Sequence, residues 1–398
     1  MSVPLDRLYN FLHDHCNHDV IIYHFFPHGS KNPNNITALF AHSTDLITLY
    51  TKPVVLFHDQ EPLTFSEWTE IHPGYKITGC PHSRFKMKVG TFSIYDKLIL
   101  VHSELNSEQV ELFDQDGAVP VYYWSHAIIA RDWFRYAERD CKLNNKNVQK
   151  QFLIYNRAWQ GSREYRLKLA DLLVINDLQH HCITSFNSVD QDKDYSKHEF
   201  VNQQFTPVTK NLASYFSQNS APSSASADYD RLDYQSTNVE VILETLFDDT
   251  RWHLTEKTFR ALAVGQPFIL CSTPGSLKYL RSYGFETFDR CWDESYDTIV
   301  DPLQRLTAIV ELMKNYKDYD IVQAKAIAQR NKQRFFSEDF WQYVVAEFET
   351  NFAHAVKLIE QSRSGAYFLR QYRAQPNIKK QIPPEIYDRV QKLLVSNK

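Results

Sequence analysis

Residues Val239–Phe288 read VEVILETLFDDTRWHLTEKTFRALAVGQPFILCSTPGSLKYLRSYGFETF, and this stretch decides the fold. Its first five residues, Val239–Leu243, form an apolar run that predicts a buried strand. After a polar loop, Thr255–Ala263 has helical periodicity, and Gly265 can end the helix because glycine tolerates positive φ. Pro267–Cys271 predicts a second short strand. Strand, helix and strand in this order predict a βαβ crossover.

Charged side chains stand at the predicted start of this helix. A helix N-terminus together with Lys257 can hold a phosphate, while the Glu256 carboxylate can hold sugar hydroxyls. Another predicted strand, Phe152–Tyr155, runs into a loop with Arg157 and Arg163, whose guanidinium groups can grip a diphosphate. The alternative interpretation is a set of surface salt bridges and a helix-start glutamate favoured by the helix dipole.

The composition is that of a globular protein large enough for two domains. The chain has 398 residues, of which 43% are hydrophobic, 23% charged and 14% aromatic. A net charge of −4 gives no overall basic character, so a nucleic-acid partner would need a local basic patch. No GxGxxG motif follows a predicted strand, which disfavours a dinucleotide-dependent oxidoreductase.

The spacing of the cysteines indicates a reducing compartment, and the lengths of the apolar runs indicate that no segment spans a membrane. The six cysteines are widely separated and form no CxxC pair, so we expect free thiols. No signal peptide is evident, and no run approaches ~20 apolar residues, so we expect no membrane span and a cytoplasmic location. His13, His15, Cys16 and His18 alternate in a way that does not converge four ligands, so we predict no metal.

Three apolar runs in the N-terminal part each end in polar and ionisable residues. They are Pro53–Phe57, Leu98–Val101 and Val119–Tyr123. This pattern predicts a parallel sheet whose strand ends face a crevice. Helices are predicted between and after these runs, at Ser107–Phe113 with Ser107 as N-cap, and at Ala127–Ala137.

Residues after two of these runs are candidates for acid–base chemistry. Asp59 and Glu61 follow Pro53–Phe57, and a carboxylate there could deprotonate an acceptor hydroxyl. The alternative is a turn with solvated charges. His126 follows Val119–Tyr123 and could act as an acid–base group or contact a donor phosphate.

The polar segment Arg139–Gln151 predicts a domain boundary. We therefore expect an N-terminal domain over 1–145, a second domain over 146–345 and C-terminal helices over 346–398. The other predicted elements are a strand at 182–184, helices at 163–173, 302–315, 320–334 and 339–363, and a mobile Ser/Ala-rich surface loop at 217–229.

The opening stretch resembles the donor-binding motif of the α1,3-fucosyltransferase family. The resemblance consists of a Thr-Glu-Lys triplet at 255–257, a helix, and the strand start Ala263–Ile269. The chain as a whole also resembles glycosyltransferases of tailed phages and marine viruses, over 25–31, 124–136 and 254–288. The donor-binding positions that the resemblance implies are Glu244, His253, Thr255, Glu256 and Lys257, with Arg163 or Arg157 for the phosphates, while Glu61-Pro62 resembles a catalytic glutamate.

The resemblance implies a GT-B fold, in which two Rossmann-like domains with mostly parallel sheets face each other and a C-terminal helix crosses back. It also implies an inverting, metal-independent transfer from a nucleotide-sugar, without a cofactor, and the host cytoplasm as the location of a viral enzyme. Glu256 would hold the ribose hydroxyls, and Lys257 and Arg163 the phosphates.

The leading hypothesis is a glycosyltransferase that uses a nucleotide-sugar donor and a glycan acceptor, with Glu61 or Asp59 as the base. One alternative acceptor is a hydroxymethylated base in phage DNA, which would require phosphate contacts and base extrusion. A second alternative is a non-catalytic sugar- or nucleotide-binding protein. The sequence does not specify the donor's base, its sugar or the oligomeric state.

Overall fold

The structure is a computed structural model that describes residues 6–16, 20–25, 53–58, 61–66, 98–115, 118–218 and 226–361. The chain forms two compact units. Unit 1 comprises Met1–Arg7 and His126–Tyr343, and unit 2 comprises Leu8–Ser125 and Val344–Lys398. Each unit contains a parallel β-sheet and is described by itself below.

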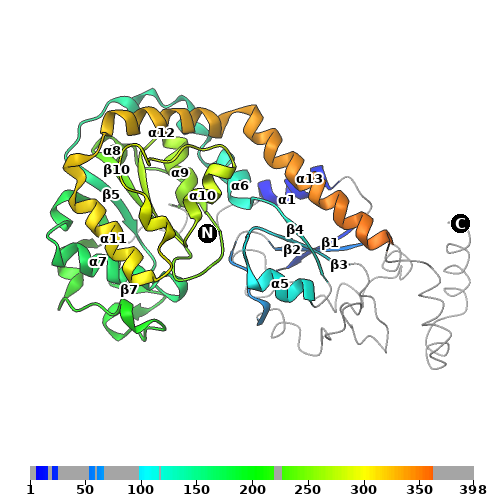
Figure 1. Cartoon of the computed structure of the whole chain (residues 1–398), viewed down its shortest axis with the longest axis horizontal. Coiled ribbons are helices and arrows are strands. Elements are labelled where there is room, and N and C mark those ends of the chain that lie inside the picture. The colour runs from blue at the N-terminus through cyan, green and yellow to red at the C-terminus, as the bar shows by residue number, and fades with distance from the viewer. Residues whose placement is uncertain are drawn as a thin grey trace, which may run out of the picture. The chain divides into compact units, whose positions relative to one another are not determined.

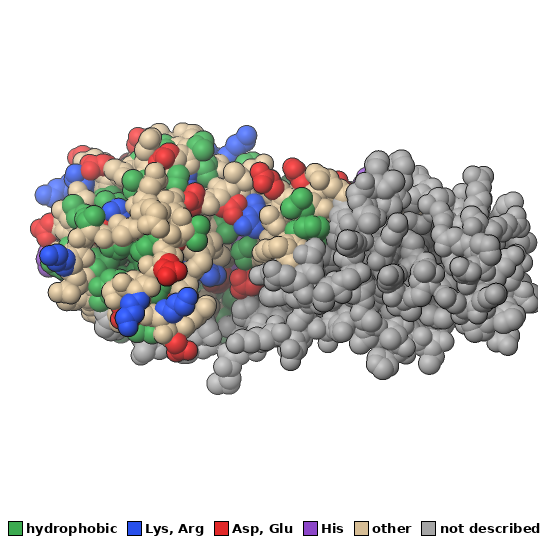
Figure 2. Space-filling view, turned by 90° about the horizontal axis from the view of Figure 1, so that it is seen from below, with side chains coloured by type: hydrophobic (Ala, Val, Ile, Leu, Met, Phe, Trp, Pro, Cys, Tyr) green, Lys and Arg blue, Asp and Glu red, His purple; other side chains and the backbone are tan. Residues whose placement is uncertain are grey.

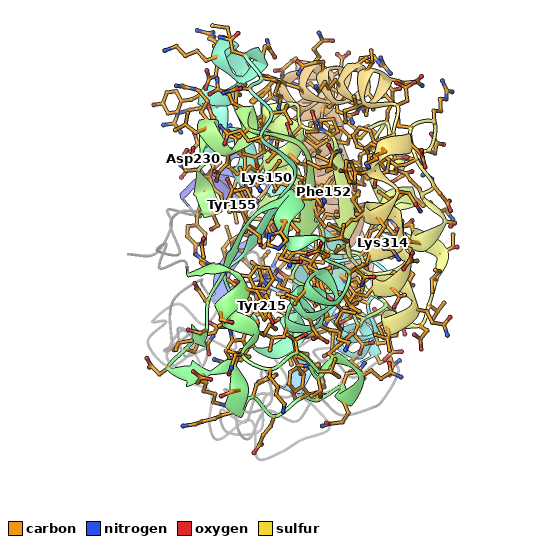
Figure 3. The ribbon with its side chains drawn as sticks, turned by 90° about the vertical axis from the view of Figure 1, so that its left-hand side faces the viewer. Lys150, Phe152, Tyr155, Tyr215, Asp230 and Lys314 are labelled. Atoms are coloured by element: carbon orange, nitrogen blue, oxygen red, sulfur yellow. The ribbon has the colours of Figure 1, made fainter. Side chains whose placement is uncertain are left out.

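The sheet of unit 1 has five parallel strands in the order β11-β10-β5-β6-β9. Its neighbouring strands β5 and β10 are labelled in Figure 1. The strands are β5 (Lys150–Asn156), β6 (Cys182–Phe186), β9 (Ser217–Gln218), β10 (Thr237–Leu243) and β11 (Phe268–Cys271). Lys150, Phe152 and Tyr155 mark the course of β5 in Figure 3. All four residues of β11 and most of β10 are buried, as expected for strands of a parallel sheet with helices on both faces.

The crossovers that leave β5 and β10 run towards opposite edges of the sheet. From β5 the chain crosses through α7 (Tyr165–Ile175) to β6 on one side, and from β10 it crosses through α9 (Glu256–Val264) to β11 on the other. Crossovers between parallel strands are right-handed, so the two helices lie on opposite faces of the sheet. α11 (Pro302–Lys314) packs against α7, and α12 (Ile321–Phe336) packs against α9.

Smaller elements complete unit 1. They are η1 (Arg135–Arg139), η2 (Cys141–Asn144), η3 (Gly161–Arg163), η4 (Gln179–His181), the hairpin β7 (Val189–Asp190) and β8 (Lys193–Asp194), η5 (Tyr195–Lys197), η6 (Gln203–Phe205), η7 (Leu212–Tyr215), α8 (Arg231–Gln235), α10 (Ser276–Ser282), η9 (Ser295–Thr298) and η10 (Tyr316–Asp318). α6 (Ser125–Trp133) and α13 (Glu338–Gln361) each have residues in both units.

The sheet of unit 2 has four parallel strands in chain order. They are β1 (Ile21–Phe25), β2 (Val54–His58), β3 (Leu98–His102) and β4 (Val119–Tyr122), accompanied by α1 (Asp6–His15) and α5 (Glu108–Gln115). The C-terminal part of α13 completes this core, because Phe348 packs against the rings of Phe11 and Tyr123.

The sequence predicted most of these elements correctly. Both strands and the helix of Val239–Phe288 are present, and Gly265 ends α9 with φ +78°. The hydroxyl of Ser107 accepts from the amide of Val110, as predicted for an N-cap. The helix predicted over 127–137 is wrong at its end, since α6 stops at Trp133 and η1 follows.

The loop predicted over 217–229 is wrong in its first residues. Ser217–Gln218 form β9, which pairs with the edge of β6. Residues 219–225 of that predicted loop lie outside the described residues.

The mixed α/β class with parallel sheets is confirmed. The domain ranges and the GT-B arrangement stay predictions. Cys16, Cys141, Cys182, Cys271 and Cys291 are free thiols, and Cys80 lies outside the described residues. Within the described ranges, no helix is long and apolar enough to cross a membrane.

Candidate functional site

The predicted donor-binding residues of unit 1 follow β5 and β10, the two strands where the sheet order reverses. Arg157 and Arg163 follow β5, while Glu244, His253 and the triplet at 255–257 follow β10. In open α/β sheets, ligands bind outside the carboxyl ends of the strands at this switch point. The topology therefore collects most of the predicted residues at the edge where a ligand is expected.

A buried carboxylate fixes the start of α9. Glu244 is fully buried, and its Oε1 accepts from the Thr255 amide at 3.0 Å and the Thr258 hydroxyl at 2.6 Å. Its Oε2 accepts from the Thr255 hydroxyl at 2.5 Å and the Thr245 amide at 3.3 Å. These four bonds occupy both oxygens, so Glu244 acts as a positioning residue for the helix start. Thr255, the N-cap of α9, is itself only 2% exposed.

The charged pair predicted at the helix start is formed within the protein. Lys257 Nζ lies 2.8 Å from Glu256 Oε1, 3.0 Å from Thr255 Oγ1 and 3.5 Å from Thr245 Oγ1. Both charged side chains are largely buried, but each keeps part of its surface in contact with solvent. These three bonds use all three N–H groups of the ammonium, so an incoming anion would replace one of these partners, and the 3.5 Å bond to Thr245 is the longest of them.

His126 also belongs to this cluster. Its Nε2 lies 3.6 Å from Glu256 Oε2, and its ring meets the His253 ring edge-on with centroids 5.1 Å apart. Burial by itself raises the pKa of the Glu256 carboxyl, but Lys257, His126 and Arg260 outweigh it and hold that pKa well below its usual range. Glu256 is therefore ionised at neutral pH and accepts hydrogen bonds, as a partner for hydroxyl groups must.

The sequence left two arginines open, and one of them, Arg157, has a described electrostatic interaction with Glu256. Its side chain is half-buried, which lowers the pKa of the guanidinium, while the Glu256 charge opposes this shift and Arg166 adds to it. Arg163 ends the short helix η3 and is half-buried as well. The structure thus gives Arg157 a described interaction with the carboxylate of the site.

Three residues tie the two loops together; Arg166 was a candidate cation of the site by sequence, whereas Tyr165 and Ser162 were not predicted. Arg166 donates to the carbonyls of Ala158 (2.7 Å), Leu243 (2.7 Å) and Glu244 (2.9 Å). The Tyr165 hydroxyl donates to Glu244 O at 2.7 Å, and the Ser162 hydroxyl donates to Thr245 O at 2.9 Å. Apart from Ala158, the acceptors are backbone carbonyls 77 to 83 residues away in sequence, and no side-chain motif predicts such contacts.

A buried ionic network supports α9 one turn beyond Glu256. Arg260 Nη2 lies 2.7 Å from Glu240 Oε1 on β10, and Arg260 Nε donates to the Tyr234 hydroxyl at 2.9 Å. The Tyr234 hydroxyl in turn donates to Glu240 Oε2 at 2.7 Å, and the Arg260 guanidinium lies over the Tyr155 ring. Strand and helix are thus joined by charge as well as by packing.

The predicted catalytic carboxylates belong to unit 2. Glu61 is partly exposed and follows β2, whereas Asp59 lies outside the described residues. Two histidines end neighbouring strands there: His58 on β2, which the sequence groups with Asp59 and Glu61, and His102 on β3. Burial and then the nearby His58 lower the pKa of His102 to about 3, so its imidazole is neutral at neutral pH.

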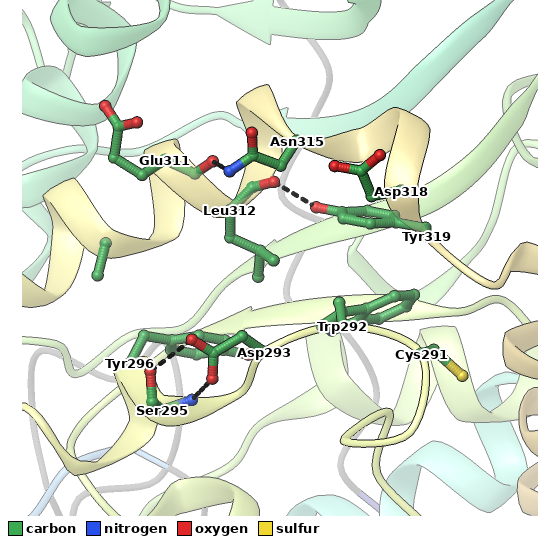
Figure 4. A pocket seen from close by; sticks show the side chains of 11 residues that line it. Cys291, Trp292, Asp293, Ser295, Tyr296, Glu311, Leu312, Asn315, Asp318 and Tyr319 are labelled. Carbon is green, nitrogen blue, oxygen red and sulfur yellow. Dashed lines mark hydrogen bonds between the residues drawn. The ribbon is translucent and has the colours of Figure 1, made fainter.

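A pocket of about 330 Å³ lies elsewhere in unit 1, between η9 and the end of α11 (Figure 4). Trp292, Tyr296 and Tyr319 line it together with Asp293, Glu311 and Asp318, among other residues. None of the predicted site residues does so. Three carboxylates line this pocket and no lysine or arginine does. The pocket is therefore unsuited to the negative charge of a nucleoside diphosphate.

No cluster of three or more His, Cys, Asp or Glu side chains in the described parts of the chain could hold a metal ion, and His18 lies outside those parts. In the comparison with known proteins, no protein-family model matches the chain, and no curated protein matches it.

Proposed function

We propose that the protein is a glycosyltransferase that takes its sugar from a nucleotide-sugar bound at the carboxyl ends of β5 and β10. The observation that carries the proposal is the joint placement of Glu256, Lys257 and Arg157 at the switch point of a parallel sheet. Such a site offers a helix N-terminus and cations to a diphosphate, and an ionised carboxylate to ribose hydroxyls.

The residues divide the work of the transfer. An acceptor hydroxyl attacks the anomeric carbon of the donor, and the bond from that carbon to the diphosphate oxygen breaks. Lys257 and Arg157, or Arg163, stabilise the negative charge that develops on the departing nucleoside diphosphate, without a metal ion. The acceptor proton goes to a carboxylate, for which Glu61 and Asp59 are the candidates. A GT-B arrangement, with donor and acceptor domains facing each other, belongs to the same proposal.

A glycan is the proposed acceptor. On the face that Figure 2 shows, Lys and Arg side chains of the described residues are interspersed with Asp and Glu. A duplex-DNA acceptor would favour a continuous basic surface, because phosphate contacts supply most of such binding. Measuring duplex-DNA binding across a salt series tests this choice, since steeply salt-dependent binding would favour the hydroxymethylated-base alternative.

The test of the activity begins with calorimetric titration of the full chain with GDP-, UDP-, CMP- and dTDP-sugars. We expect one of them to bind and to be hydrolysed slowly when no acceptor is present. Lys257→Ala should abolish transfer, and so should Arg157→Ala or Arg163→Ala, whichever arginine holds the phosphates, while the far-UV circular dichroism spectrum stays that of the folded wild type. Lys314→Ala is the matched control, because Lys314 is an exposed lysine on α11 that pairs only with Glu311 in the described structure.

Two results would contradict the proposal. Turnover close to wild type in Lys257→Ala would show that the switch-point cluster does not hold the donor. Saturable binding of a nucleotide-sugar with no hydrolysis and no transfer to any glycan would instead support a non-catalytic binding protein.

A further inference from the structure

A rigidly held tryptophan stands in the loop between β10 and α9. The Trp252 indole N–H donates to Pro274 O at 2.9 Å, and its ring stacks on Tyr279 with centroids 5.9 Å apart and an interplanar angle of 22°. Gly275 lies against the ring edge with φ +81°, and a Cβ there would come within 3.1 Å of the indole nitrogen. Proline carbonyl, glycine and tyrosine together fix both the position and the tilt of the ring.

This ring is not fully covered. Trp252 is half-buried rather than buried, unlike His253, Leu254 and Thr255 that follow it. Within the described residues, Tyr279 is the aromatic ring that stacks on the indole. A large apolar surface held by a hydrogen bond and left partly in water is typical of a stacking platform for a ligand.

The platform lies within reach of the proposed phosphate site. Only two residues separate Trp252 from Thr255, so their Cα atoms are at most about 11 Å apart. The loop that carries Trp252 contacts the residues after β11, at the same carboxyl edge of the sheet, because Thr273 donates to Arg251 O. A nucleotide whose diphosphate lies at the start of α9 can therefore extend along this loop to Trp252.

We propose that Trp252 is the residue on which the nucleobase of the donor stacks. The inference rests on the proposed function and deepens it, because it names the part of the donor that this side chain recognises. Stacking accepts any planar base and contributes binding energy without selecting one, so edge contacts elsewhere must choose among bases. Because the ring is already fixed, little conformational entropy of the side chain is lost when a base binds to it.

The experiment compares a ligand with a base and one without. The full chain is titrated with GDP, UDP, CDP and dTDP, and with inorganic pyrophosphate, in the wild type and in Trp252→Leu and Trp252→Tyr. We expect Trp252→Leu to weaken the tightest-binding nucleoside diphosphate by roughly 5- to 150-fold, the range that one stacked base contributes. Pyrophosphate affinity should not change, and Trp252→Tyr should recover most of the loss.

Gly275→Ala provides a second variant that leaves the indole in place. Its added methyl group pushes the ring edge, so it should weaken nucleoside diphosphates and spare pyrophosphate. Equal affinity of wild type and Trp252→Leu for nucleoside diphosphates would overturn the inference, as would an equal loss for pyrophosphate. The proposed function fails separately, if Lys257→Ala binds pyrophosphate and nucleoside diphosphates as tightly as the wild type.

Discussion

Replacing Glu244 by glutamine separates a positioning role from a ligand-binding role. The carboxylate accepts two hydrogen bonds on each oxygen, and each pair includes one backbone N–H, from Thr255 on Oε1 and from Thr245 on Oε2. An amide group has one acceptor oxygen, so its NH₂ must face one of these backbone donors, which cannot turn away. The weaker Thr245 bond, at 3.3 Å, is the one we expect to be lost.

The magnitude follows from this geometry. A buried donor left without an acceptor costs about 1–3 kcal/mol, and the Thr255 hydroxyl, which also accepts from Lys257 Nζ, loses the acceptor for its own proton. We expect Glu244→Gln to lower the free energy of unfolding by about 2 kcal/mol. For a unit of this size that corresponds to a fall in melting temperature of roughly 4–8 °C.

Calorimetric melting and nucleoside diphosphate titration measure the two consequences in the same sample. Affinity should fall by about tenfold, equivalent to 1.4 kcal/mol, because Lys257 is no longer aimed by a fixed Thr255. Glu311→Gln is the control, since it makes the same chemical change at an exposed position of α11. Lost affinity with an unchanged melting temperature would refute the reasoning, because it would show that Glu244 contacts the ligand and does not stabilise the start of α9.

Two further predictions concern stability. Glu240→Ala should lower the free energy of unfolding by about 3–5 kcal/mol, because it leaves the buried Arg260 guanidinium unpaired, whereas Glu240→Leu combined with Arg260→Met should cost much less in urea unfolding. Burial, and then the nearby Glu294, raise the pKa of Asp297 to about 6, despite the opposing amides of Leu277 and Lys278. A carboxyl whose pKa is raised on folding contributes stability below its unfolded pKa near 3.8, and this is lost as the pH rises to about 6. The melting temperature of Asp297→Asn should therefore rise relative to that of the wild type between pH 4 and pH 6, and a constant difference between the two proteins would contradict this assignment.

Local chemistry explains which parts of the fold could be predicted from the sequence. The strands of unit 1 are short apolar runs with clear ends, and α9 has a threonine cap at one end and a positive-φ glycine at the other. These signals depend on neighbouring residues only. The end of α6 was predicted too late because Arg135–Arg139 keeps a helix-like pattern while its backbone tightens to a 3₁₀-helix.

Contacts between distant segments limit how much of the structure can be predicted from the sequence. Lys146, in a segment predicted as a polar boundary, donates to Tyr234 O, Thr237 O and the Gln266 side chain, and none of these partners is visible in the local pattern. The same is true of the site: the sequence placed Glu256 and Lys257 at a helix start, but gave no sign that Glu244 would be enclosed by threonines. Its full burial depends on how the loop after β10 folds back.

The division of the chain into units has a consequence for synthesis on the ribosome. Unit 2 begins near the N-terminus but needs residues from Val344 onwards, while nearly all of unit 1 lies in the uninterrupted stretch His126–Tyr343. Chains emerge N-terminus first and domains fold as units. The four-stranded sheet of unit 2 therefore emerges before the continuous stretch of unit 1, and the α13 side of its core stays uncovered until α13 has been made.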